Sequence, residues 1–555
     1  MSFFDDTVIV DEIDLALDAV ERLVPEFAAV GLTVELTKSK ALISDPTDLS
    51  DQQRERLANM GLQVVSDGLD ILGTPVGSAT YIRSRLTDHV NRAESILRHF
   101  SRADTLGFLN KELSASQGIY HAVRDCVNQY CRHLQRTVHP DYTVPTLRQL
   151  DERTVALVAK IFEIANPSEL TKGRIGLPGS LGGLGVTRYT DTAIPAYLSC
   201  LYRVGPMLAQ ALPTEVVTLT GYDDVRGQLI DYIEDEEGIP SSEEAFFRNP
   251  SEQQVGASSL QRSLTWKVHQ KRREALVSIA TPVEQYFLRV TTNQTSADFL
   301  FVPITNSRYR MKRTFRTSVR LYLGQPVTLN TCSIGDCSRT PCLPYGEHGH
   351  HARSRINARH NAIRDVLVNF FKGLRTSGQS DLICKEEVPL GEYNIAQRSD
   401  AVREGEARCD FLLENPITQR VLFADVMVTH PKISIPRNAK ESLAAARNGV
   451  KLKKRRYCDN FVVDEADIKP IVFETMGGTA EESFNFLREV VKVISADDEH
   501  LFAQLWRTLR SRIAVALAVG HADVIHCLNS KQRHRMGVLA YENSMIAMSH
   551  QLGGL

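Results

Sequence analysis

The sequence predicts an α+β multidomain protein, and three observations lead to that class. The chain has 555 residues, more than one hydrophobic core usually serves, so several domains are expected. Short β-like apolar runs lie near the start and in the last third of the chain, and the long part between them has helical apolar spacing. The composition, 43% hydrophobic and 24% charged, is ordinary for globular protein, and the formal net charge of −2 excludes a uniformly polybasic chain. Any nucleic-acid surface must therefore come from local patches.

Two adjacent acids open the chain. Asp5 and Asp6 stand between Phe3-Phe4 and the apolar run 7–10, which predicts a hairpin with the acids at its turn. Adjacent aspartates of this kind can hold the Mg²⁺ ions of two-metal phosphoryl transfer, although they are also common turn residues.

The elements then follow in order. Within residues 1–80 we expect a helix over 14–27, a strand over 33–36 and a strand over 71–78 interrupted by Gly and Pro. Helices dominate the middle of the chain, helix and strand alternate after the Cys/His-rich stretch, and the end is helical again. The expected segments are 81–170 (helical), 171–330 (helical after a glycine-rich break at 176–185), 331–361 (Cys/His-rich), 362–500 (mixed) and 501–555 (helical).

Neither a membrane span nor a signal peptide is expected. No stretch reaches the roughly 18 to 20 apolar residues of a membrane helix, and the best candidate, 513–519, runs into Gly520 and His521. The sequence therefore predicts an intracellular protein without a membrane partner.

A cluster of cysteines and histidines predicts a zinc site. Seven of the ten cysteines are scattered, as free thiols are. The clustered side chains are Cys332, Cys337, Cys342, His348, His350 and His351. Structural Zn²⁺ takes four such ligands, and Cys337, Cys342, His348 and one of the last two histidines would suffice, with Cys332 as a competitor. The alternative is an exposed histidine-rich loop.

A second pair of acids lies on two expected strands. Arg359-His360-Asn361 begins an expected helix over 362–371, and strands over 408–413 and 421–428 carry Asp410 and Asp425. Two carboxylates on neighbouring strands can share one Mg²⁺ and activate a water against a phosphodiester. They could instead be strand-end aspartates facing solvent, but an unpaired carboxylate inside the apolar strand around Asp425 would be costly.

Basic side chains supply candidate phosphate contacts. Lys451, Lys453 or Lys454 would place a cation near the scissile phosphate, or they form a solvated helix end. Two stretches interleave cations with aromatics, and the same pattern also fits amphipathic helices with aromatics inward. Their cations are Arg308, Arg310, Lys312 and Arg313 in one stretch, and Lys271, Arg272 and Arg273 in the other.

The order of these motifs resembles the C-terminal part of a non-LTR retrotransposon reverse transcriptase. Phe3-Phe4-Asp5-Asp6 looks like the family's aromatic-x-Asp-Asp hairpin, Gly31-Leu32 with Lys38-x-Lys40 like its next motif, and Leu72-Gly73-x-Pro75-x-Gly77 like its primer-grip hairpin. The Cys/His cluster, Arg359-His360-Asn361, Asp410 and Asp425 resemble the restriction-enzyme-like endonuclease of early-branching elements. Two departures are Cys409, where the family usually has proline, and a knuckle without a clear final cysteine.

The resemblance implies a domain order and an activity. It implies a truncated reverse-transcriptase palm (1–80), a helical thumb (81–170), a helical linker (171–330), a small zinc knuckle (331–361), a PD-(D/E)xK-like α/β nuclease core (362–500) and C-terminal helices (501–555). The nuclease would use Mg²⁺ or Mn²⁺ and the knuckle Zn²⁺. Asp410, Asp425 and one of Lys451, Lys453 or Lys454 would be catalytic, with Glu386 or Glu387 as a further acid. The partners would be target DNA and element RNA, in the nucleus at the site of integration.

The position of Asp5 suggests that the sequence is the C-terminal part of a longer reading frame. Polymerisation by this chain alone is not expected, because a third aspartate and the fingers would lie upstream. The main expectation is DNA nicking that primes reverse transcription. The alternative is a catalytically dead, nucleic-acid-binding remnant of a transposon, and a third possibility is a complete polymerase whose start was misplaced.

Overall fold

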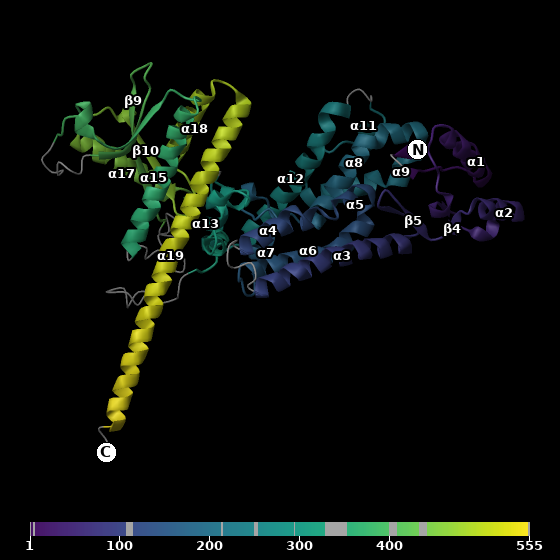
Figure 1. The fold of residues 1–555 in the computed structure, drawn as a ribbon, viewed down its shortest axis with the longest axis horizontal. Helices are drawn as coiled ribbons and strands as arrows, with labels where there is room; N and C mark the ends of the chain where they lie inside the picture. Colours follow the sequence, from purple (N-terminus) through teal and green to yellow (C-terminus); the bar gives the residue numbers. More distant parts are fainter. Residues whose placement is uncertain are drawn as a thin grey trace. The chain divides into compact units, whose positions relative to one another are not determined.

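The computed structural model describes most of the chain. The described residues are 2–3, 6–106, 115–212, 215–248, 253–293, 295–327, 352–398, 408–431 and 441–552, with the backbone alone at 2–3, 6, 103–106, 115, 253–258 and 531–552. The described part is mixed and mostly helical, with small sheets, as the α+β prediction requires (Figure 1).

The chain divides into two compact units, and each is assembled from three stretches. One unit comprises Met1–Arg98, Val127–Thr154 and Arg188–Val268, and the other comprises His99–Cys126, Val155–Thr187 and His269–Leu555. The candidate nuclease residues 353–495 all lie in the second unit.

The start of the chain forms a hairpin, as expected, but Asp6 belongs to its second strand and not to its turn. Strands β1 (Ser2–Phe3) and β2 (Asp6–Thr7) pair antiparallel, with Ser2 opposite Thr7 and Phe3 opposite Asp6. Asp5 lies outside the described residues, and the side chain of Asp6 does as well.

One strand prediction near the start needs correction, and another is refined. In place of the strand expected over 33–36, a 3₁₀ turn (Leu36–Lys38) precedes β3 (Lys40–Leu42). The single strand expected over 71–78 is a hairpin of β5 (Gly68–Ile71) and β6 (Thr74–Gly77). The turn residues Leu72 and Gly73 have φ of 49° and 77°, the left-handed values that a two-residue hairpin turn favours. The remaining elements here are α1 (Ile13–Ala29), α2 (Asp51–Met60) and β4 (Gln63–Val65).

The middle of the chain is helical, as expected, and it breaks at the predicted glycine-rich segment. Its helices are α3 (Ala79–Leu106), α4 (Ala115–Asp125), α5 (Arg132–Thr137), α6 (Pro140–Ile161), α7 (Glu169–Gly176), α8 (Tyr189–Ala211), α9 (Val216–Thr220), α10 (Tyr222–Ile233), α11 (Ser242–Phe246), α12 (Gln253–Ile279), α13 (Pro282–Val290) and α14 (Thr314–Tyr322). In the first unit the buried Asp151 carboxylate accepts the backbone N–H groups of Tyr189 and Thr190 at 2.8 and 2.9 Å, which caps the start of α8.

A four-stranded sheet organises the last third of the chain. Its elements are α15 (Arg353–Thr376), β7 (Ile383–Pro389), β8 (Arg408–Glu414), β9 (Val421–Thr429), α17 (Ala444–Asn460), β10 (Ile468–Glu474) and α18 (Glu481–Ser495). The strand order is β10-β9-β8-β7. Strands β7, β8 and β9 form an antiparallel meander, and β10 pairs parallel with β9 after the crossover through α17.

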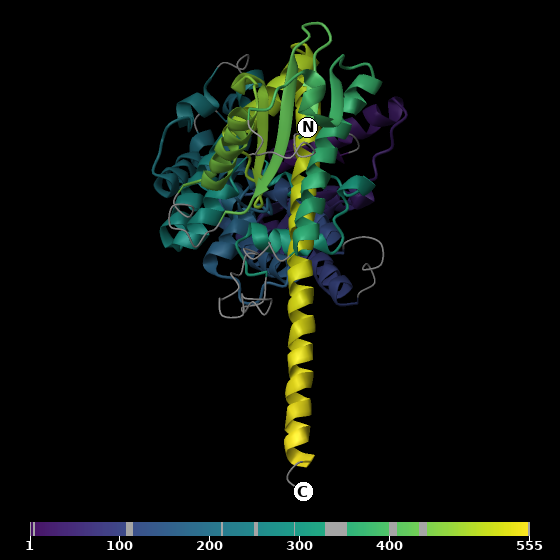
Figure 2. The ribbon, with the colours of Figure 1, turned by 90° about the vertical axis from the view of Figure 1, so that its left-hand side faces the viewer.

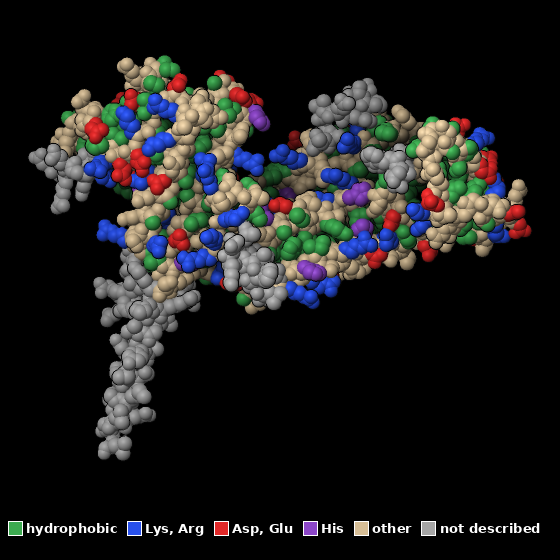
Figure 3. All heavy atoms as spheres, viewed as in Figure 1, with side chains coloured by type: hydrophobic (Ala, Val, Ile, Leu, Met, Phe, Trp, Pro, Cys, Tyr) green, Lys and Arg blue, Asp and Glu red, His purple; other side chains and the backbone are tan. Residues whose placement is uncertain are grey.

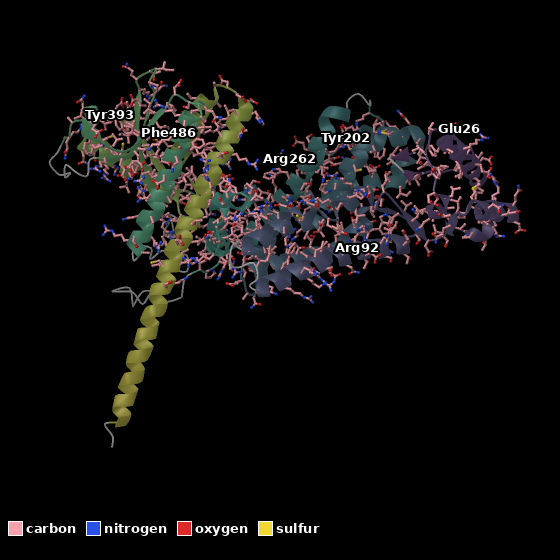
Figure 4. The ribbon with its side chains drawn as sticks, viewed as in Figure 1. Glu26, Arg92, Tyr202, Arg262, Tyr393 and Phe486 are labelled. Carbon is pink, nitrogen blue, oxygen red and sulfur yellow. The ribbon has the colours of Figure 1, made fainter. Side chains whose placement is uncertain are left out.

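Helices cover both faces of this sheet. The alternating side chains Phe411, Leu413 and Ile471 pack into one core with α15, α18 and the long helix α19 (Glu499–Leu552). Leu412, on the opposite face of β8, packs into a second core with Tyr457 of α17. Figure 2 shows α15 and α19 running side by side along the sheet. In Figure 4 the labelled Phe486 belongs to the α15 side and Tyr393 to the α17 side.

Helix α15 begins earlier than expected. Arg359-His360-Asn361 is not the first turn of a helix, because α15 starts at Arg353. Ala352 and Ile356 pack against Val524 and Leu528 of α19, and this distant contact stabilises the extra turns.

The C-terminal helix bears on the prediction that no segment spans a membrane. By length and composition alone, one helix in the described part, Glu499–Ser530 within α19, could cross a membrane, with a mean hydropathy of 1.4. Half of its apolar window is buried inside the protein, where Ile513 and Leu517 contribute to the core around α15. Because buried core helices pass the same test, the finding is only weak support for a membrane span.

Candidate functional site

The β8–β9 hairpin brings Asp410 and Asp425 to facing positions. The last paired residues of the two strands are Phe411 and Ala424, so the next residues along each strand are Asp410 and Asp425. Beyond this point β9 continues to pair with β10 but no longer with β8 in the described part. The backbone N–H of Val426 donates instead to Asp410 Oδ2 at 2.6 Å. The two carboxylates therefore lie where the strands separate.

Asp425 is buried and held by two donors from one helix. Its side chain is only 7% exposed. Lys453 Nζ lies 2.8 Å from Asp425 Oδ1, and the Tyr457 hydroxyl donates to Asp425 Oδ2 at 2.7 Å. Lys453 and Tyr457 stand one turn apart on α17, so their side chains leave the same face of the helix.

Asp410 is held from the opposite side of the site. His360 Nε2, on α15, lies 3.1 Å from Asp410 Oδ1. Asp410 and His360 are both more accessible than Asp425, since their side chains are 18% and 30% exposed. Helix α15 thus supplies a polar contact to one carboxylate, and helix α17 supplies two to the other.

The two carboxyl groups have different proton affinities. Burial would raise the pKa of Asp410, but hydrogen bonds from His360, Asp425 and the Val426 N–H outweigh it and hold this pKa below its ordinary value of 3.8. Burial raises the pKa of Asp425, the Lys453 ammonium opposes that shift, and the Asp410 carboxylate adds to it. Asp425 therefore keeps a proton to higher pH than Asp410 does, as expected for two acids that share one site.

The structure distinguishes among the three predicted lysines. Lys453 contacts Asp425, whereas Lys454 Nζ points to Glu482 and Glu465 at 2.7 and 3.2 Å. Lys451 is exposed. The geometry therefore selects Lys453 as the lysine of this site.

Packing of α17 on the sheet explains why Lys453 points inward. Ala446, Val450 and Tyr457 are buried, and Lys453 falls on the same stripe at helical spacing. Gly449 permits the close approach, because a Cβ at this position would lie 2.8 Å from Val472 Cγ1 of β10. The apolar stripe was a signal available in the sequence, and it would have separated Lys453 from its neighbours.

A groove of about 410 Å³ adjoins the carboxylate pair. It runs along β9 past the end of its pairing with β8, between the start of α15 and the middle of α17. Its lining residues are Ile356, Asn357, Arg359, His360, Val426, Met427, Val428, Leu452, Lys453 and Arg456. In Figure 3, Lys and Arg side chains are interspersed with Asp and Glu, so the face that is shown is not uniformly basic.

The three residues of the Arg-His-Asn motif have different surroundings. Arg359 is buried, with Nη1 3.1 Å from His521 Nδ1 of α19, and burial lowers its pKa to about 10. Gly520 makes room for it, since a Cβ there would lie 2.5 Å from Arg359 Cγ. His360 contacts Asp410, and Asn361 is exposed. Among these three, His360 alone touches a carboxylate of the pair.

The two further acids of the prediction pair with α15. Arg364, one turn beyond His360, forms ion pairs with Glu386 and Glu387, and Lys372 lies 3.4 Å from Glu386 Oε2. These contacts hold both glutamates at the α15 surface of β7.

The carboxylate pair fits a divalent ion in donor type. Among the described residues, no group of three or more His, Cys, Asp or Glu side chains is arranged to hold a metal. Mg²⁺ commonly takes one or two carboxylates, with waters and substrate phosphates as its other ligands. Each oxygen of Asp425 accepts one hydrogen bond from α17. Burial is the main cause of the raised pKa of Asp425, and the charge of Asp410 adds to it, so a cation between the two acids would offset that second part.

The other predicted site residues are separate from this pair or lie outside the described residues. Cys332, Cys337, Cys342, His348, His350 and His351 lie outside them, so the zinc prediction stays a prediction. Arg308, Arg310, Lys312 and Arg313 are exposed while Phe315 is fully buried, as in an amphipathic segment. Lys271, Arg272 and Arg273 are half-buried on α12.

Sequence reasoning did not assign Tyr457 to the site. Its hydroxyl is the second donor to Asp425 and also lies 3.2 Å from the Arg408 carbonyl oxygen. Burial and the Asp425 carboxylate raise its pKa, so the phenol stays protonated and donates. The sequence signal for Tyr457 was its position four residues after Lys453, which places both side chains on the same face of a helix.

Comparison with known proteins adds no assignment. No protein-family model matches the chain, and no curated protein matches it either.

Proposed function

We propose that the sheet domain around Asp410 and Asp425 is a divalent-metal-dependent endonuclease that cleaves phosphodiesters of DNA. One observation carries the proposal. A buried carboxylate bound by a lysine and a tyrosine faces a second carboxylate where two strands separate, beside a groove lined by cations. A purely structural ion pair would not require a second, like-charged acid at the next cross-strand position.

The residues of the pair have distinct roles in this proposal. Asp410 and Asp425 would hold the ion, with His360 and Tyr457 fixing one oxygen of each carboxylate. A bound Mg²⁺ supplies Lewis acidity and lowers the pKa of a coordinated water. Lys453, next to Asp425 Oδ1, offers a positive charge to the phosphate oxygens on which negative charge accumulates during hydrolysis.

The wider setting is also proposed from the sequence. The motif order supports a place in the C-terminal part of a non-LTR retrotransposon reverse transcriptase, acting on target DNA in the nucleus with element RNA as a partner. Zn²⁺ would bind the Cys/His cluster. Metal analysis of the purified chain is expected to give one zinc, reduced in Cys337→Ser and unchanged in Cys126→Ser, a matched scattered thiol that is exposed. Equal zinc content in both variants would contradict the knuckle.

Nicking of supercoiled plasmid tests the proposed function. In Mg²⁺ or Mn²⁺, the wild-type chain is expected to nick, and Asp425→Ala is expected to lose at least about 1,000-fold in rate, because it removes a metal ligand. Asp464→Asn is the matched control, since Asp464 is an exposed acid of the same domain that caps a 3₁₀ turn.

The outcomes separate the two functional alternatives. Equal nicking by wild type and Asp425→Ala would show a contaminant and contradict the assignment. Binding of DNA without nicking, over a panel of target sequences, would favour the nucleic-acid-binding remnant.

A further inference from the structure

The groove beside the carboxylate pair has an apolar wall as well as a charged rim. Leu452 is 50% exposed, and Ile356, Met427 and Val428 are half-buried around it. A leucine half exposed to water on an otherwise polar helix surface gains free energy when a ligand covers it. The wall therefore favours a ligand with an apolar face.

The rim of the same groove is polar and carries the cations Lys453 and Arg456. His360 and Lys453 stand where the groove meets Asp410 and Asp425, and Arg456 stands one turn beyond Leu452 on α17. Its neighbour Arg455 does not line the groove. A ligand that fills the groove therefore meets positive charge along its length and apolar side chains at its wall.

We propose that the groove binds one unpaired nucleotide adjacent to the phosphodiester that Asp410 and Asp425 cleave. This inference rests on the proposed endonuclease function and names the form of its substrate. The phosphates of such a nucleotide face the rim, and its base, released from stacking, lies against Leu452 and Met427. A base is flat and apolar on its faces, so any of the four bases fits this wall.

Size and charge support an unpaired nucleotide over a duplex. A volume of about 410 Å³ lies at the small-ligand end of protein pockets, the scale of one nucleotide. A paired base shows only its edges and keeps its faces stacked, so intact duplex would leave Leu452 against sugar and phosphate. An unpaired base can therefore cover the apolar wall, whereas intact duplex leaves it exposed to polar groups.

Binding measured without cleavage tests the inference. The full chain, with no Mg²⁺ or Mn²⁺ added, is titrated by fluorescence anisotropy against one DNA sequence in three forms: single strand, perfect duplex, and duplex with one unpaired nucleotide. The wild-type chain is expected to prefer both unpaired DNA forms to the duplex by at least about fivefold.

Two matched pairs of variants locate the preference. Leu452→Ala is expected to lose about fivefold on the unpaired forms alone, and Val493→Ala, which changes a 70% exposed apolar residue on α18, is expected to bind as wild type does. Arg456→Gln is expected to weaken all three DNA forms alike and to reduce the salt slope by about one, while Arg455→Gln leaves both unchanged.

The result that overturns the inference is equal binding of all three DNA forms by wild type, or equal effects of Leu452→Ala and Val493→Ala. Because the binding assay measures no cleavage, failure of this inference can be distinguished from failure of the proposed nuclease function. A retained binding preference without nicking in Mg²⁺ would contradict the nuclease function but not the nucleotide-binding groove. Nicking without any binding preference would contradict the groove but not the nuclease function.

Discussion

Replacing Tyr457 by phenylalanine removes one donor of the carboxylate site. The change deletes the hydroxyl that donates to Asp425 Oδ2 at 2.7 Å and leaves the ring in its core. Since the ring volume is kept, no cavity term is expected. A hydrogen bond to a charged group contributes about 1.5–3 kcal/mol, and Asp425 is too buried to replace the donor with bulk water. We expect the free energy of unfolding to fall by that amount near neutral pH.

The loss depends on pH with a definite sign. The Tyr457 hydroxyl stabilises the ionised form of Asp425, so its removal raises further a pKa that burial already raises. The difference in stability between wild type and Tyr457→Phe is therefore small where Asp425 is protonated in both, and it grows as pH rises through the pKa of Asp425. The nicking rate should fall on the acid side of its pH profile as Asp425 becomes protonated. Because the pKa of Asp425 is higher in Tyr457→Phe, this fall (the acid limb) is expected at higher pH in the variant.

Urea unfolding at several pH values, with nicking rates alongside, measures both effects. Tyr393→Phe is the matched control, because its hydroxyl lies 2.7 Å from Lys385 Nζ, a side chain that is half exposed. The control is expected to lose less than about 1 kcal/mol. Equal losses in the two variants, or an acid limb that does not move in Tyr457→Phe, would refute the reasoning.

Two further changes probe how the site is positioned. Gly449→Ala is expected to cost about 1 kcal/mol in urea unfolding and to slow nicking, because a Cβ at 2.8 Å from Val472 overpacks the α17–sheet contact by more than the alanine gains in helix propensity. Gly373→Ala, in α15 with open space around its Cβ, is expected to gain stability, and a loss there would undercut the comparison. His360→Asn removes a hydrogen bond that lowers the pKa of Asp410, so the loss of stability as pH falls below about 4 is expected to be shallower than in wild type. Identical acid profiles would show that His360 does not act on Asp410.

The hairpin of β8 and β9 shows what the sequence alone could establish. Counting back from the turn at 415–420 places Asp410 opposite Asp425, so the juxtaposition follows from the strand register and the loop length. The choice of Lys453 was also within reach, since Ala446, Val450 and Tyr457 define the buried stripe of α17.

Other features required contacts between residues far apart in the chain. The early start of α15 depends on Ile356 packing against a helix that begins at Glu499, and local spacing carries no sign of that contact. The separation of β8 and β9 beyond Phe411 and Ala424, which opens the groove, is likewise a property of the assembled sheet. The apolar run 513–519 was too short in the sequence to predict a membrane helix, and the structure places Ile513 and Leu517 in the core around α15.

Nicking rates of Lys453→Gln and Lys454→Gln, measured side by side in Mg²⁺, test the central claim most directly. The two lysines are adjacent, but only Lys453 contacts Asp425, while Lys454 pairs with two glutamates. The account predicts a loss of at least about 100-fold for Lys453→Gln, by removal of a charge beside the reacting phosphate, and a change within about threefold for Lys454→Gln. Equal rates in the two variants, or the larger loss in Lys454→Gln, would contradict the assigned site.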